Sequence, residues 1–274
     1  MMRRLIFAAA AMAAALSLYA MPSSADALAD IKAKGTLIVG VKADYPPYGF
    51  RDSSGKIVGF EPDIAADMAK RLGVALELVP VVASNRMQFL QQGKIDLMIA
   101  TMSINDERRK AVGIVEPAYY ASGVAILVNK KANIKSAADL KGKPVCAIQG
   151  AFYNSRIQSE FTGRDLVAFK GVPENEQALL NGDCVGFVYD DTLLIYKKRA
   201  EGSKWDDFEV LELTEFEPQP WGAAVKLEDR DGPWGKFVSS VLSDGLKSGA
   251  MLALEKKWLG QNTKWLEAAT TAAK

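Results

Sequence analysis

Residues 36–72 read TLIVGVKADYPPYGFRDSSGKIVGFEPDIAADMAKRL. The apolar run at 36–41 predicts a strand, which must end where two prolines follow, because proline lacks the N–H that a strand needs. Turn residues at 52–55 predict a hairpin between short strands. A helix is expected from Pro62, since proline suits the first helical position and the neighbouring acidic residues complement the helix dipole. A strand that opens into an aromatic, proline-rigid loop is typical of the ligand-binding edge of an α/β protein.

The rest of the chain alternates between short apolar runs and helical patterns. Further strands are expected at 75–82, 95–100, 144–149 and 185–189, and further helices at 86–92, 134–140, 174–181, 236–248 and 251–258. Strands separated by helices imply an α/β fold with parallel sheets covered on both faces. Two long extended runs, 119–128 and 218–225, are interpreted as crossings between two halves of the protein.

The N-terminus predicts a secretory signal peptide over residues 1–27. Basic residues lie within 1–4, an Ala-rich apolar run follows at 5–20, and small residues offer cleavage after Ala25 or Ala27. The alternative is a transmembrane anchor, for which the run is short. We therefore expect an exported protein whose mature form is soluble.

Composition excludes several classes of function. The chain has no histidine, so Ser–His and Cys–His nucleophile chemistry is absent and the commonest metal ligand is missing. Its two cysteines are far apart and lack zinc-binding spacing. Lys and Arg total 34 against 33 Asp and Glu, which leaves no electrostatic footprint for nucleic acid. We expect neither a metal nor another cofactor.

Three motifs resemble the family 3 solute-binding proteins, which are periplasmic polar amino-acid receptors of ABC transporters. They are the loop at 44–48, the G-F-E-P-D segment at 59–63, and ATMSINDERRK at 100–110. The resemblance is to glutamate/aspartate-type members in particular. It implies a two-lobe, type II periplasmic-binding-protein fold with a ligand cleft between the lobes and a two-strand hinge.

The same resemblance implies boundaries and partners. Lobe 1 would comprise 28–122 plus 221–274, and lobe 2 would comprise 123–220. A cleft between lobes is a preferred small-molecule site, and hinge closure is the expected motion. The expected partners are a free amino acid and an inner-membrane ABC permease, and the receptor is expected to be a monomer.

The segment after the strand at 95–100 carries the first group of expected ligand contacts. Thr101 and Ser103 offer hydroxyls and backbone N–H groups, and Arg108 presents a planar fork of donors that matches a carboxylate. The resemblance implies that Arg108 holds the ligand α-carboxylate. The alternative is that Arg108, with Arg109 and its neighbours, forms a solvated charged helix face.

An acidic pair follows the predicted strand at 185–189. A bound amino acid carries an ammonium that needs a buried carboxylate, because an unpaired charge in a closed cleft is costly. The resemblance implies that Asp190 supplies this carboxylate and that Asp191 caps the next helix. The alternative is that both acids are helix caps.

The remaining expected contacts concern selectivity. Lys42 and Arg86 would together favour an acidic ligand over a basic one, although a lysine at a strand end is usually solvated. Tyr45 and Tyr48 would form an aromatic wall, with core packing the alternative for Tyr48. In QGAFYN (149–154) the resemblance implies two hydroxyl residues where Ala151 and Phe152 stand, and Phe152 could stack on the ligand or narrow the cleft.

An exported chain meets oxidising conditions, so a disulfide between Cys146 and Cys184 is expected, as in glutamate-type members of the family. Two buried thiols are the alternative. The sequence thus predicts a receptor that binds an acidic or other polar L-amino acid without catalysis. The rival interpretation is an enzyme on the same scaffold, a cyclohexadienyl dehydratase, with Asp190 or Glu174 as its acid.

Overall fold

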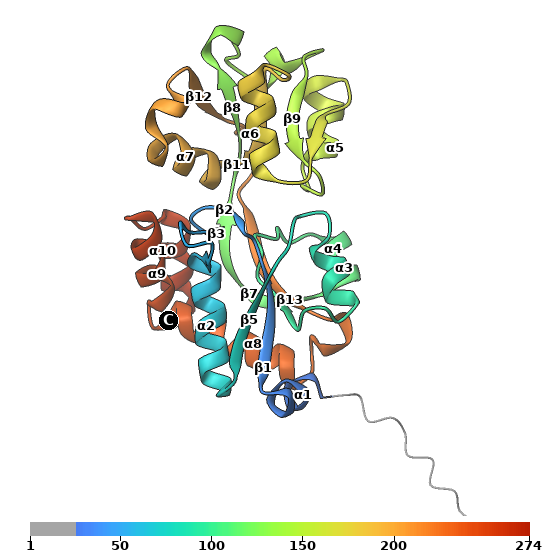
Figure 1. The fold of residues 1–274 in the computed structure, drawn as a ribbon, viewed down its shortest axis with the longest axis vertical. Coiled ribbons are helices and arrows are strands. Elements are labelled where there is room, and N and C mark those ends of the chain that lie inside the picture. The colour runs from blue at the N-terminus through green and yellow to red at the C-terminus, as the bar shows by residue number, and fades with distance from the viewer. Residues whose placement is uncertain (1–25) are drawn as a thin grey trace, which may run out of the picture.

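The structure is a computed structural model that describes residues 26–274, and these residues fold into two lobes stacked along the long axis of the molecule (Figure 1). The predicted signal peptide lies outside the described residues except for its last two positions. Asp26 caps the first helix, α1 (Ala27–Lys34), through its side chain. The two-lobe α/β fold expected from the sequence is confirmed.

The first lobe is built on a five-stranded sheet with the order β5-β1-β6-β13-β7. Its strands are β1 (Thr36–Val41), β5 (Ala75–Pro80), β6 (Leu97–Met98), β7 (Gly113–Ser122) and β13 (Gln219–Val225). β1 pairs in parallel with β5 and β6, whereas β13 runs antiparallel to β6 and β7. The expected parallel pairs form, but the sheet is mixed, because the strand that returns from the other lobe enters it in the opposite direction.

Helices and a small hairpin complete the first lobe. The helices are α1, α2 (Phe60–Leu72), α3 (Arg86–Gln91), α4 (Asp106–Ala111), α8 (Pro233–Lys247), α9 (Ala250–Leu259) and α10 (Lys264–Ala273), with a 3-10 turn at Leu227–Asp229. The predicted hairpin forms a separate sheet of β2 (Asp44–Tyr45), β3 (Gly49–Arg51) and β4 (Ile57–Val58). Strand β6 is shorter than the expected 95–100, although the N–H groups of Asp96 and Ile99 still donate to strand β1.

The second lobe repeats the mixed arrangement with the strand order β10-β9-β11-β8-β12. Its strands are β8 (Val124–Asn129), β9 (Val145–Ile148), β10 (Val167–Phe169), β11 (Gly186–Asp190) and β12 (Phe208–Glu212). Its helices are α5 (Asn154–Arg156), α6 (Val172–Asn181) and α7 (Asp191–Ala200), with a π-helical turn at Ile157–Thr162 and 3-10 turns at Lys130–Ala132, Ala137–Leu140 and Gly202–Trp205. β9 pairs in parallel with β10 and β11, and β8 is antiparallel to β11 and β12.

The chain crosses between the lobes twice. It passes from β7 into β8 through Gly123 alone, and it returns between β12 and β13. Figure 1 shows both crossings side by side at the waist of the molecule. A Cβ at Gly123 would lie 2.5 Å from Asp191 Oδ2, so only glycine lets the first crossing pack this closely against the start of α7.

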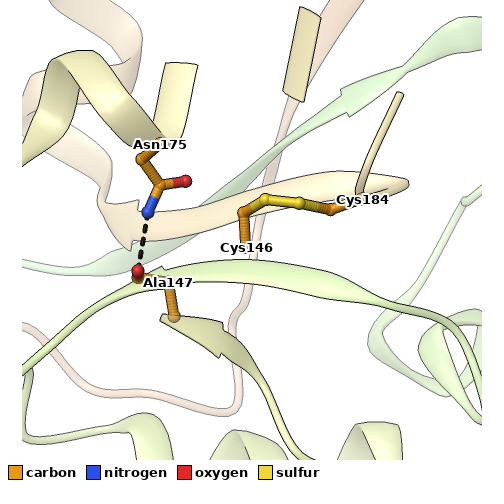
Figure 2. Close-up of a disulfide and its surroundings, with 4 residues drawn as sticks. All are labelled: Cys146, Ala147, Asn175 and Cys184. Atoms are coloured by element: carbon orange, nitrogen blue, oxygen red, sulfur yellow. Dashed lines mark hydrogen bonds between the residues drawn. A yellow bond between two sulfur atoms is a disulfide. The ribbon is translucent and has the colours of Figure 1, made fainter. Parts of the chain in front are cut away.

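The predicted disulfide is confirmed. Figure 2 shows Cys146 of β9 bonded to Cys184, which follows α6, with their Cα atoms 5.6 Å apart. In the same picture Asn175 Nδ2 of α6 donates to the Ala147 carbonyl over 2.6 Å. Both contacts fix α6 and the segment after it to β9, in the second lobe.

Candidate functional site

A small cavity lies between the two lobes. Its lining comes from both of them: Ala83, Arg86, Thr101, Ser103 and Arg108 from the first, and Ala151, Phe152, Tyr153, Tyr189 and Asp190 from the second. The cavity is about 10 Å³, which is room for about one water molecule. The lobes are therefore in a closed arrangement, and an amino acid would enter only after they move apart.

Direct hydrogen bonds hold this closed arrangement. The Tyr45 hydroxyl donates to Asp190 Oδ2 over 2.8 Å, and the Val172 N–H donates to Asp44 Oδ2 over 3.0 Å. Beside the cavity the backbones themselves approach, since a Cβ on Gly150 would lie 2.9 Å from the Ala83 carbonyl oxygen. Gly150 also has φ +82°, a conformation that L side chains rarely adopt.

Arg108 is placed at the cavity by helix α4. Asn105 caps this helix, its side chain accepting from the Arg108 N–H over 2.8 Å. The guanidinium donates to the Ser103 carbonyl (2.7 Å) and, across the lobes, to the Gly150 carbonyl (3.0 Å). Burial, together with the charge of Arg86, lowers the pKa of Arg108 to about 10. The solvated-face interpretation fits Arg109, which is exposed and pairs with Glu116, but not Arg108, which is buried.

Asp190 lies opposite, at the carboxyl end of β11. It is buried, and burial raises its pKa to about 6 in spite of the Tyr45 hydrogen bond and the charges of Arg86 and Arg108, which lower it. The interpretation of the acidic pair as side-chain helix caps is wrong. Neither carboxylate caps α7, and Asp191 Oδ1 instead accepts a 2.6 Å hydrogen bond from Ser122 Oγ at the hinge.

Arg86 is the second cation of the cavity lining. It lies at the start of α3, is 3% exposed and donates through Nη1 to the Ala100 carbonyl. Burial lowers its pKa, whereas nearby anionic groups, Asp190 and Glu61 among them, raise it. Within residues 26–274 no carboxylate oxygen lies within 4.0 Å of either Arg86 or Arg108 in an ion pair.

Three of the expected contacts do not line the cavity. Lys42 is fully buried and its Nζ lies 2.9 Å from Asp44 Oδ1, so the expectation of two cations aimed at one pocket holds for Arg86 but not for Lys42. Tyr45 does not line the cavity itself, but its hydroxyl donates to Asp190, which does. Tyr48 packs against Tyr45 with ring centroids 5.6 Å apart, which fits the core-packing alternative.

Two lining side chains were not expected from the sequence. Tyr189 precedes Asp190 on β11, where alternation predicts a core position. Tyr153 follows Ala151 and Phe152, both of which line the cavity. Its hydroxyl is buried, and no hydrogen-bond partner for it occurs among the described residues. Tyr153 thus brings a buried hydroxyl to the cavity lining next to Phe152, where the resemblance implied a hydroxyl residue.

Comparison with known proteins agrees with this architecture. The L-cystine-binding protein TcyJ of Escherichia coli K12 is 32% identical over 234 residues, covering 84% of this chain and 85% of that protein. The glutamine-binding protein GlnH of Bacillus subtilis is 30% identical over 245 residues (88% and 87%). The glutamate/aspartate import solute-binding protein of Salmonella typhimurium is 25% identical over 248 residues (86% and 80%).

Solved structures give the same result. A mutant of ArgBP from T. maritima superposes with a TM-score of 0.77 at 32% identity, covering 86% of this chain and all of that one. An ancestral amino-acid-binding protein described as a precursor of cyclohexadienyl dehydratase has a TM-score of 0.74 at 31% identity (84% and 98%). Residues 37–261 match the bacterial extracellular solute-binding proteins of family 3. The chain belongs to this family.

Proposed function

We propose that this protein is an exported receptor that binds an L-amino acid between its lobes and delivers it to an inner-membrane ABC permease. The observation that carries the proposal is the placement of Arg108 and Asp190 on opposite lobes, both buried and both lining one cavity. An α-carboxylate on Arg108 and an α-ammonium on Asp190 would bridge the lobes. A ligand that bonds to both lobes favours the closed form and shifts the population toward it.

We further propose that the preferred side chain is acidic, as in glutamate or aspartate. Arg86 supports this, because it is a buried cation of the cavity lining with no ion-paired carboxylate among the described residues. A second ligand carboxylate would compensate its charge. Relatives that are named for cystine and for glutamine define the competing ligands, an amino acid with two ammonium and two carboxylate groups and one with a neutral polar side chain.

We also propose boundaries for the two lobes. We place lobe 1 at 28–122 plus 221–274 and lobe 2 at 123–220, with the hinge at the two crossings. We also place signal-peptide cleavage after Ala25, since that site retains Asp26, which accepts hydrogen bonds from the N–H groups of Leu28 and Ala29 at the start of α1. No helix in residues 26–274 has the length and apolar character needed to cross a membrane.

The rival function is a dehydratase, supported by the likeness to the ancestral precursor and by the raised pKa of Asp190, which suits a proton donor. Glu174, the other acid considered, does not line the cavity. We propose a binding protein without catalysis, because Asp190 is accounted for as the partner of an ammonium. Turnover of prephenate by the purified protein would support the enzyme instead.

A thermal-shift panel of the mature protein against all amino acids, cystine included, tests the receptor function. Ligand at about 100 times Kd adds about 2.7 kcal/mol to stability. For a chain of this length that raises the melting temperature by roughly 5–10 °C. We expect glutamate or aspartate to give the largest shift in slightly acidic buffer. A panel without any shift would contradict the receptor proposal, and a shift by cystine or glutamine alone would contradict only the acidic ligand.

A further inference from the structure

Glu61 lies behind the cavity and bonds to one of its walls. It is the second residue of α2 and is fully buried. Its Oε1 accepts from the Thr101 N–H over 2.7 Å and from the Tyr119 hydroxyl over 2.5 Å. Its Oε2 is buried and has no hydrogen-bond partner among the residues that the structure describes. The Glu61 carboxylate is therefore not a solvated charge at the end of a helix.

Arg86 and Glu61 bind the two ends of the same peptide group. Arg86 donates to the carbonyl of Ala100, and Glu61 accepts from the N–H of Thr101. The peptide between Ala100 and Thr101 is therefore held between a guanidinium and a carboxylate at the cavity wall. Thr101 has φ +49°, which is unusual for a β-branched residue and requires support from its surroundings.

The charges of Glu61, of the groups that line the cavity and of the Lys42–Asp44 pair balance only when Glu61 is ionised. The cations Arg86, Arg108 and Lys42 are buried, as are the anions Asp190 and Glu61, whereas Asp44 is half-buried and pairs with Lys42. An amino acid with an uncharged side chain adds no net charge, so the sum stays at zero. An amino acid with a side-chain carboxylate leaves one uncompensated negative charge, which is costly in a buried site unless Glu61 takes up a proton.

We propose that Glu61 is a specificity-determining residue: protonated, it lets Arg86 serve a ligand carboxylate, and ionised, it favours a neutral side chain. This inference rests on the proposed function, since it assumes an amino acid held by Arg108 and Asp190. Glu61 itself touches no ligand in this scheme. It acts through the Ala100–Thr101 peptide and through its charge.

The proton would be exchanged near neutral pH. Burial raises the pKa of Glu61 to about 7, in spite of the Tyr119 and Thr101 hydrogen bonds and the charges of Arg86 and Lys42, which lower it. Arg86 and Lys42 face Glu61 as cations, and burial raises the pKa values of the phenols that face it, Tyr119 and Tyr189, well above their usual range.

Binding of glutamate should therefore pass through an optimum between pH 6 and pH 7. Above about pH 7 the Glu61 proton is lost and Kd rises, approaching tenfold per pH unit. Below about pH 6 Asp190 becomes protonated and the ammonium loses its partner. Glutamine, which is neutral, should show the acidic limb alone.

Isothermal titration calorimetry of the mature protein with L-glutamate and L-glutamine, from pH 5 to 8.5 and at pH 7 in both phosphate and HEPES, tests this. Buffers of different protonation enthalpy report the proton uptake directly. In wild type we expect uptake with glutamate and none with glutamine at pH 7. In Glu61→Gln we expect no uptake, a flat glutamate Kd above pH 7, and a preference for glutamate over glutamine that rises at least tenfold at pH 8.

Two further variants serve as a matched control and as a substitute in case Glu61→Gln does not fold. Glu255→Gln is the matched control, because Glu255 is equally buried and also accepts from a tyrosine hydroxyl (Tyr120, 2.7 Å) and a backbone N–H (Thr263, 3.0 Å) without lining the cavity. It should keep the wild-type profile. Should Glu61→Gln not fold, Tyr119→Phe removes the hydrogen bond that lowers the Glu61 pKa and should move the alkaline limb to higher pH.

The outcomes separate the two proposals. If amino acids bind and Glu61→Gln has the pH profile and the ligand preference of wild type, the role of Glu61 is refuted while the receptor function stands. The same holds if wild type binds only glutamine and Glu61→Gln gains no glutamate binding. If no amino acid binds at any pH, the receptor function fails and the role of Glu61 fails with it.

Discussion

Replacing Tyr45 with phenylalanine should weaken ligand binding by opening the lobes. The Tyr45 hydroxyl of the first lobe donates to Asp190 of the second over 2.8 Å, and both side chains are buried. A hydrogen bond to a charged group contributes about 1.5–3 kcal/mol. Because this bond joins the lobes, its loss destabilises the closed form and should raise Kd roughly 10- to 150-fold.

The effect of Tyr45→Phe should also depend on pH. The Tyr45 hydrogen bond lowers the pKa of Asp190, which burial holds at about 6. Without that bond the pKa rises, so more Asp190 is protonated at a given pH and fewer molecules carry the carboxylate that the ammonium needs. The ratio of variant to wild-type Kd should therefore grow as the pH falls from 8 to 6.

Calorimetric titration at pH 8, 7 and 6 measures both effects, with thermal unfolding to check the fold. Tyr120→Phe is the matched control, because its hydroxyl donates over 2.7 Å to Glu255 within the first lobe. The control should bind as wild type does. A Tyr45→Phe protein that is folded and binds within twofold of wild type at all three pH values would refute the role of this bond in closure.

Three other variants probe the clamp, closure and stability. Arg108→Ala should raise Kd at least about 30-fold and abolish the thermal shift, because a buried partner of the ligand charge is lost; a retained shift would remove Arg108 from the site. Gly150→Ala places a Cβ 2.9 Å from the Ala83 carbonyl and imposes a φ of +82° on an alanine, so it should weaken binding and also lower the unfolding temperature, and unchanged affinity would contradict tight closure there. Replacing both Cys146 and Cys184 by alanine removes a cross-link over a sequence separation of 38 and should lower the free energy of unfolding in denaturant by about 4 kcal/mol. A loss below about 1 kcal/mol would contradict the chain-entropy argument.

Much of the fold follows from local patterns in the sequence. The strand at 36–41, the hairpin and the helix after Gly59 all form as expected, because proline, glycine and turn residues restrict the backbone wherever the chain folds. The direction of β13 could not be read in this way. An extended run looks the same in a parallel and an antiparallel pair, and only the return of the chain from the second lobe decides its direction.

In the candidate site too, some residues are placed by local sequence features and others by the tertiary fold. Arg108 lines the cavity where the motif placed it, since a strand end, a capped helix and an arginine at fixed spacing are local features. Lys42 does not, because its partner Asp44, two residues along, pairs with it inside the protein. Nor could the sequence show that Tyr153 carries a buried hydroxyl to the cavity, since that depends on where the second lobe closes on the first.

Residues 36–72 contribute more to the site by support than by contact. None of its residues lines the cavity, yet Asp44 and Tyr45 bond to the second lobe and Glu61 bonds to the cavity wall. Glu61 reads in sequence as a helix-end acid that complements the dipole of α2, and it does lie in the first turn. Its side chain, however, is fully buried, where a charge has to be matched by others nearby. Selectivity for ligand charge in this receptor would then depend on the sum of the buried charges around the cavity, and the groups in contact with the ligand supply only part of that sum.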